Sequence, residues 1–63
     1  MKIKFEYAYN NYEVDFDADN IATTLSAIRR IVEDYSYPIK FYNTPPDILL
    51  EYLDNNGYEM EVL

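Results

Sequence analysis

The chain contains no cysteine and no histidine, and it has a single glycine among its 63 residues. Without cysteine there is no disulfide and no thiolate ligand, and without histidine the commonest general base and metal ligand are missing. One glycine cannot build a glycine-rich phosphate-binding loop. We therefore expect no enzymatic activity, no cofactor and no metal site, and a fold that depends on its hydrophobic core or on a partner for stability.

Basic residues are also scarce, because five lysines and arginines stand against twelve acids and give a net charge of −7. All five basic residues lie in residues 1–40 beside seven acids, whereas residues 41–63 contain five acids and no Lys or Arg. This charge repels nucleic acid and anionic membranes, so direct binding to either is disfavoured. A positively charged partner is the natural complement.

Long apolar runs are absent as well. The first residues, "MKIKFEYAYN", alternate charged and apolar side chains, which is unlike a signal peptide, and no transmembrane run follows. We expect one soluble, cytoplasmic domain spanning residues 1–63. A chain of this size buries only about 60% of the surface that its unfolded form exposes, so its core is small.

Two alternating runs predict a β-hairpin at the N-terminus. Residues 2–9 and 12–17 each place apolar side chains at every second position, as half-buried strands do. Asn10 and Asn11 separate the two runs and tolerate positive φ, which favours a two-residue type I′ turn. In that register Phe5 lies opposite Phe16.

The next segment has the period of a helix. Its apolar stripe has spacings of four and three and comprises Ile21, Leu25, Ile28, Val32 and Tyr35. Asp19 or Asn20 can cap the first turn with a side-chain oxygen. We therefore predict a helix that begins near Asn20 and ends near Tyr35.

Proline and glycine delimit the rest of the chain. Residues 39–42 have the composition of a short strand, and "TPPD" predicts a second helix over residues 45–55 with Thr44 as its N-cap. Gly57 is placed to end this helix in a left-handed conformation, and residues 58–63 resume the alternation of a strand. The order is ββαβαβ. It predicts an α+β domain with a mixed sheet, a parallel crossover through the second helix, and both helices on one face.

The stretch "EVDFDADN" invites comparison with a calcium-binding loop. Asp15, Asp17 and Asp19 match the first three oxygen ligands of an EF-hand. The sixth position is Asn20 instead of glycine, however, and the twelfth is Ser26 instead of glutamate. We expect no calcium site, because strand alternation and helix capping already explain these acids.

Two groups of acids are placed where they repel one another. In the predicted register Glu6 lies opposite Asp15, and Asp47, Glu51 and Asp54 are spaced i, i+4 and i+7 on the second helix. A cationic partner would explain such clustering, whereas an acidic surface that only keeps the protein in solution is the simpler alternative. The candidate partner-binding residues are Glu6, Glu13, Asp15, Asp17, Tyr42, Asp47, Glu51, Asp54, Glu59 and Glu61.

The eight tyrosines divide into two groups. Tyr37 and Tyr42 lie off the apolar stripes, and Tyr42 would suit an arginine-bearing partner through stacking and charge together. The tyrosines expected in the core or at its edge are Tyr7, Tyr9, Tyr12, Tyr35, Tyr52 and Tyr58.

In size, acidity and lack of catalytic residues, the chain resembles small inhibitors of host defence encoded by phages or mobile elements, including DNA mimics and anti-CRISPR proteins. The resemblance is one of composition over the whole chain. It implies a protein that acts in the host cytoplasm by occupying a basic, nucleic-acid-binding surface of a defence protein.

Two other functions also fit the sequence. One is a non-catalytic interaction or assembly module, for instance a homodimer that uses Ile31 and Leu50 as an apolar seam. The same two residues could instead belong to wide buried helix faces. The other is an antitoxin-like neutraliser of a basic toxin or nuclease.

Overall fold

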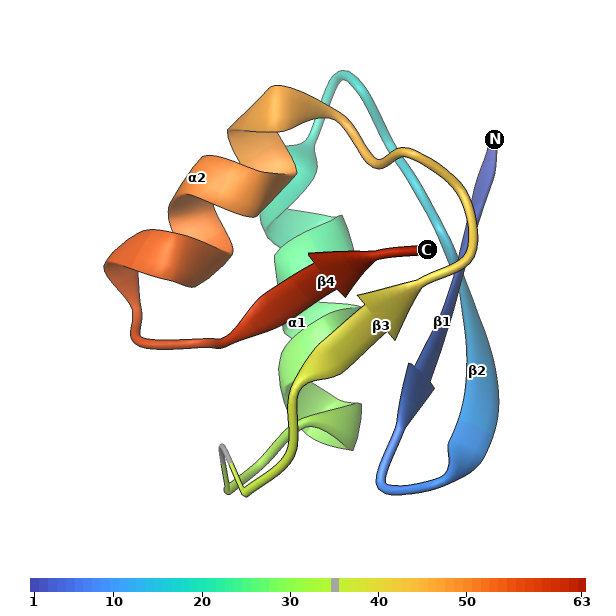
Figure 1. Cartoon of the computed structure of the whole chain (residues 1–63). Coiled ribbons are helices and arrows are strands. Elements are labelled where there is room, and N and C mark those ends of the chain that lie inside the picture. The colour runs from blue at the N-terminus through green and yellow to red at the C-terminus, as the bar shows by residue number, and fades with distance from the viewer. Residues whose placement is uncertain (35) are drawn as a thin grey trace.

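The computed structural model describes residues 1–34 and 36–63. The elements follow the predicted ββαβαβ order and form an α+β domain (Figure 1). The strands are β1 (Lys2–Tyr7), β2 (Asn10–Asp15), β3 (Ile39–Phe41) and β4 (Met60–Val62), and the helices are α1 (Ile21–Ile31) and α2 (Asp47–Asn55).

The four strands form one mixed sheet in the order β2-β1-β3-β4. β1 is antiparallel to both of its neighbours, whereas β3 and β4 are parallel and are joined through α2. A parallel pair needs such a crossover, so this part of the predicted topology is confirmed. Both helices cover one face of the sheet and leave the other face open (Figure 1).

The core lies between the sheet and the two helices. Phe5 and Phe41 stand side by side at its centre, with ring centroids 5.9 Å apart. Every second residue of a strand points into this core, as the alternation of apolar and polar residues predicts. The other fully buried apolar side chains are Ile3, Ile28, Val32, Ile39, Leu49 and Leu53.

The hairpin turns at Ala8 and Tyr9, so the prediction of a turn at Asn10 and Asn11 was wrong by two residues. Both turn residues have positive φ, 51° and 68°, as a type I′ turn requires. Asparagine tolerates this backbone better than alanine or tyrosine does. The neighbouring asparagines nevertheless belong to β2.

The earlier turn changes every cross-strand partner. Phe5 lies opposite Tyr12 instead of Phe16. The ring centroids of Phe5 and Tyr12 are 5.7 Å apart. A slip by an odd number of residues would exchange the two faces of a strand, but a slip by an even number keeps each side chain on its face. Hydrophobic alternation therefore cannot distinguish the predicted register from the observed one.

Helix α1 begins where it was predicted but ends at Ile31, earlier than expected. The predicted end at Tyr35 falls on a residue outside the described ranges. Asn20 occupies the N-cap position without a side-chain cap bond, so the predicted capping by Asp19 or Asn20 was wrong. The C-cap N–H of Val32 still bonds to the last turn.

The early end of α1 also changes the surroundings of its basic residues. Glu33 and Asp34 lie outside the helix, and among the described residues they form no ion pair with Arg29 or Arg30. Asp34 instead accepts a hydrogen bond from the hydroxyl of Tyr7, which ties the segment after α1 to β1. This bond lowers the pKa of Asp34 and raises the pKa of Tyr7.

Helix α2 begins at Asp47 with Pro46 at the N-cap, later than the start predicted at Pro45 with Thr44 as the cap. A proline disfavours helical geometry in the residue before it, so Pro46 keeps Pro45 out of the helix. The carbonyl of Pro46 then accepts the N–H of Leu50 at 3.2 Å.

The predicted end of α2 is confirmed. Gly57 has φ of +84°, its N–H bonds to the carbonyl of Asp54 at 3.1 Å, and the N–H of Tyr58 bonds to the carbonyl of Leu53 at 3.0 Å. This pair of bonds is a Schellman motif, in which the left-handed residue satisfies the last free carbonyls. The buried side chains of Leu53 and Tyr58 supply its hydrophobic contact.

Most of the tyrosines predicted for the core are indeed buried or half-buried. Those that are buried or half-buried, as predicted, are Tyr7, Tyr12, Tyr52 and Tyr58. Tyr9 is 84% exposed because it lies in the turn, so its predicted core position was wrong. The prediction for Tyr35 falls outside the described residues.

Candidate binding surface

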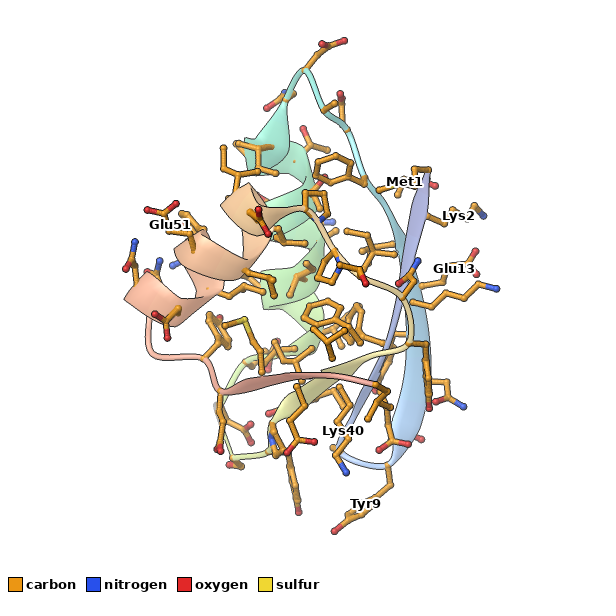
Figure 2. All side chains as sticks on the ribbon, turned by 45° about the horizontal axis from the view of Figure 1, so that its top comes forward. Met1, Lys2, Tyr9, Glu13, Lys40 and Glu51 are labelled. Carbon is orange, nitrogen blue, oxygen red and sulfur yellow. The ribbon has the colours of Figure 1, made fainter. Side chains whose placement is uncertain are left out.

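The acids on the open sheet face lie among lysines. In the observed register Lys2 is opposite Asp15 and Lys4 is opposite Glu13. The Nζ atoms of Lys2 and Lys4 lie 2.9 and 3.9 Å from the carboxylate of Glu13, and Figure 2 shows the two labelled partners Lys2 and Glu13 together. The hydrogen bond between Lys2 and Glu13 lowers the pKa of the carboxyl and raises that of the ammonium.

Glu6 also has compensating neighbours, so the predicted like-charge pair with Asp15 was wrong. Glu6 lies between Asn11 of β2 and Lys40 of β3. The hydroxyl of Tyr42 shares its single proton between two acceptors, the side-chain oxygen of Asn11 at 2.7 Å and a carboxylate oxygen of Glu6 at 3.3 Å. Burial and the nearby carboxylate raise the pKa of Tyr42. Tyr42 is therefore bonded within the chain, although 45% of it is exposed.

Asp17 shapes the corner between β2 and α1. Its Oδ1 atom accepts the N–H groups of Asp19 and Asn20 at 3.0 and 3.2 Å. Thr24, which is buried in α1, accepts the N–H of Asp17 at 3.0 Å and donates to the carbonyl of Asp15 at 3.3 Å. A turn at Asn10 and Asn11 would place Asp17 opposite Lys4, but Asp17 in fact follows the end of β2 and its carboxylate serves a local turn.

The acids of the C-terminal strand lie at the edge of the same sheet. Glu61 is paired with Lys40 on the open face, and the carbonyl of Glu59 accepts the N–H of Ile39 at 2.9 Å. Both side chains are exposed. They continue the open face beyond Lys40, where the chain supplies no further basic residue.

The acids of α2 lie apart from the lysines of the hairpin. Asp47, Glu51 and Asp54 are all exposed, and none of them forms an ion pair within residues 1–34 and 36–63. Figure 2 shows Glu51 on the outer side of α2, away from Lys2 and Glu13. Arg29 of α1 reaches α2 on another flank, where its guanidinium lies 5.9 Å from the centre of the Tyr52 ring.

A groove runs beside these acids, between α2 and β4. Its volume is about 460 Å³, and it is lined by Leu50, Glu51, Asp54, Met60 and Val62. Three of the lining side chains are apolar and two are carboxylates, and the groove is wide open to solvent. A second groove of about 400 Å³ lies beside β2 and is lined by Lys4, Asn11, Tyr12, Glu13 and Tyr42.

Sequence reasoning missed two features of the surface. The first is the apolar lining of the α2–β4 groove: Met60 and Val62 lie on the same face of the sheet as the buried Ile39 and Phe41, but Val62 on the edge strand stays half exposed. The second is the hairpin tip, where the exposed ring of Tyr9 meets that of Tyr37 with centroids 5.6 Å apart. The tip could have been found only from the position of the turn.

No other kind of site emerges from the described residues. Among them, no three acidic side chains gather in a way that could hold a metal ion. No helix in the described part of the chain is long and apolar enough to cross a membrane. No family model matches the chain, and neither do curated proteins or solved structures at a significant level.

Proposed function

We propose that this protein binds a basic surface of another protein and blocks it, using the acidic face that α2 and β4 share. The observation that supports the proposal is the uneven compensation of charge. Acids on β1 and β2 have lysines as cross-strand neighbours, although only Glu13 among the described acids forms an ion pair, whereas those of α2 have neither. The acids of this surface, called the acidic face below, are Asp47, Glu51 and Asp54 of α2 and, on the open side of the adjoining sheet edge, Glu59 and Glu61.

The partner class follows from the charge and from the resemblance in composition to anti-defence proteins. A surface that carries several exposed carboxylates, with Lys40 beside Glu61 at its border, complements one that normally holds phosphates. A nucleic-acid-binding protein of a host defence system is therefore the proposed partner. A basic toxin or nuclease would fit the same face, and only the identity of the bound protein separates these two.

The like charges on α2 support a binding function over solubility alone. Asp47, Glu51 and Asp54 are helix neighbours at i, i+4 and i+7, and each like-charge i,i+4 pair destabilises a helix by about 0.2–0.5 kcal/mol. Asp54 also lies near the negative end of the helix dipole. A cationic partner would offset these costs on binding, and binding should be fast and sensitive to salt.

The test compares two charge reversals of equal size. Glu51→Lys with Asp54→Lys alters the acidic face, and Asp19→Lys with Glu33→Lys makes the same change in net charge at exposed positions elsewhere. Each variant and the wild type are immobilised and exposed to host lysate at low and high salt. We expect the wild type and the control variant to retain the same host proteins, and nucleic acid to displace them. The Glu51→Lys with Asp54→Lys variant should retain less than about a tenth as much of these proteins.

Equal capture by both double variants would refute this proposal, and so would capture that salt and nucleic acid leave unchanged. Mass spectrometry of the retained proteins then decides between a defence protein and a toxin. Circular dichroism checks that both variants are folded.

A second candidate function is an apolar interaction module centred on the hairpin tip. Tyr9 is 84% and Tyr37 is 44% exposed, and exposed tyrosines are common interface anchors. The predicted seam of Ile31 and Leu50 is less suited, because both side chains are half-buried against the core. Capture that Tyr9→Ser abolishes and salt does not weaken would favour this function.

A further inference from the structure

The groove between α2 and β4 adjoins an open edge of the sheet. β4 pairs with β3 on one side, and within the described residues no strand lies on its other side (Figure 1). An edge strand presents unpaired N–H and C=O groups that can pair with another extended chain. The residues that line the groove come from this edge strand, Met60 and Val62, and from α2, Leu50, Glu51 and Asp54.

The unpaired backbone groups belong to Met60 and Val62. The carbonyl of Glu59 and the N–H of Leu63 bond to β3, at 2.9 and 2.8 Å. Successive residues of a strand direct their backbone groups to opposite edges, so Met60 and Val62 point theirs toward the open side. Their side chains line the groove, and Val62 is 50% exposed.

The surroundings of this edge specify the side chains of an added strand. On the helix-covered side they would meet the apolar side chains of Leu50, Met60 and Val62. On the open side they would meet Glu61, whose other neighbour across the sheet is Lys40. An extended segment that alternates apolar and basic residues satisfies both sides at once.

We infer that the partner is engaged by β-strand addition, in which an extended segment of alternating apolar and basic residues pairs with the open edge of β4. Its apolar side chains occupy the groove beside Glu51 and Asp54, and its basic side chains contact Glu61 on the open side. This inference rests on the proposed function, because it specifies how the acidic face binds. Main-chain hydrogen bonds provide affinity, and the groove with its carboxylates provides specificity.

The probe is a capped eight-residue peptide of alternating lysine and valine. Two controls carry the same sequence, one with every valine amide N-methylated and one with every lysine amide N-methylated. The N–H groups of the valines point to one edge of the peptide strand and those of the lysines to the other, so each control blocks one edge. We expect the control whose blocked edge faces β4 to lose about tenfold or more in affinity, and the other control to bind like the unmethylated peptide. Hydrogen exchange should show new protection at the amides of Met60 and Val62.

The matching protein variants are Val62→Pro and Val62→Ala. Proline removes the outward N–H and is tolerated on an edge strand, whereas alanine removes most of the side chain and keeps the N–H. We expect Val62→Pro to weaken peptide binding about tenfold and Val62→Ala to weaken it less. The peptide controls test the same bond in the unmodified protein, so the result stands even if a variant is unfolded.

Several results would overturn the inference. The inference is wrong if the peptide does not bind, or if all three peptides bind with equal affinity. It is also wrong if Val62→Ala weakens peptide binding as much as Val62→Pro does. If the peptides bind equally but Glu51→Lys with Asp54→Lys abolishes binding, strand addition fails while the proposed function stands. If protection of Met60 and Val62 grows with protein concentration in the absence of peptide, a second copy of the chain occupies the edge instead.

Discussion

The strained turn at Ala8 and Tyr9 allows a direct test of the hairpin register. A left-handed backbone costs an ordinary L-residue about 1–2 kcal/mol, and asparagine followed by glycine is the favoured pair for a type I′ turn. Both residues have positive φ, 51° and 68°. The double variant Ala8→Asn with Tyr9→Gly should therefore relieve about 2–4 kcal/mol of strain.

Two losses reduce this gain. The edge-on contact between Tyr9 and Tyr37 has a centroid distance of 5.6 Å, and such a pair contributes about 0.5–1.5 kcal/mol. Glycine also loses about 0.5–1 kcal/mol of chain entropy on folding. The expected net effect is a stabilisation of about 1 kcal/mol, which raises the melting temperature of a domain this small by about 4–8 °C.

The control moves the same pair of residues along the chain. Asn11→Gly creates asparagine followed by glycine at positions 10 and 11, which belong to β2. Glycine in a strand should destabilise the protein by about 0.5–1 kcal/mol, and the variant also loses the bond from Tyr42 to Asn11. Thermal and urea denaturation followed by circular dichroism measure both variants. If the signs are reversed, the turn lies at Asn10 and Asn11 and the argument from positive φ is refuted.

Two further predictions concern the ends of the helices. Gly57→Ala should lower the free energy of unfolding by about 1–2 kcal/mol in urea denaturation, because alanine is strained at a φ of +84°. Nothing lies within 4 Å of the added methyl group, so the backbone strain is the only expected effect. An unchanged denaturation midpoint would contradict the left-handed cap. Tyr7→Phe should raise the pKa of Asp34 toward its ordinary value in an NMR titration, because the hydrogen bond holds that pKa down. The stabilisation from Asp34 is present above its unfolded pKa and lost as the pH falls through the folded pKa, so the wild type and Tyr7→Phe should converge in stability in acid.

The parts of the fold that could be predicted depend on local chemistry. Gly57 ends α2 because only a residue tolerant of positive φ fits there, and the alternation of the strands gives the buried face of each one. The register of the hairpin could not be predicted, since an even slip leaves both faces unchanged. The start of α2 was misplaced because the second proline of the pair restricts the first.

The candidate site shows the same division. The spacing of Asp47, Glu51 and Asp54 places them together on α2 whatever the tertiary structure. The groove beside them exists only because the parallel crossover brings β4 alongside α2. Sequence periodicity carries no information about that adjacency, so Leu50 could be identified as an off-stripe residue but not as part of a groove.

The register of the hairpin determines which acids have unfavourable neighbours. With the turn at Ala8 and Tyr9, the acids of β2 lie opposite lysines, an arrangement that stabilises the sheet without any partner. Those acids are therefore explained by the fold. The carboxylates of α2 form no ion pair within the described chain, and although the helix dipole favours Asp47 in the first turn, the repulsion of Glu51 by its neighbours would be relieved by a cationic partner. A search for the binding partner should accordingly vary the charges of α2 first and keep Lys2 and Glu13 intact, since changing that pair perturbs the hairpin as well as the surface.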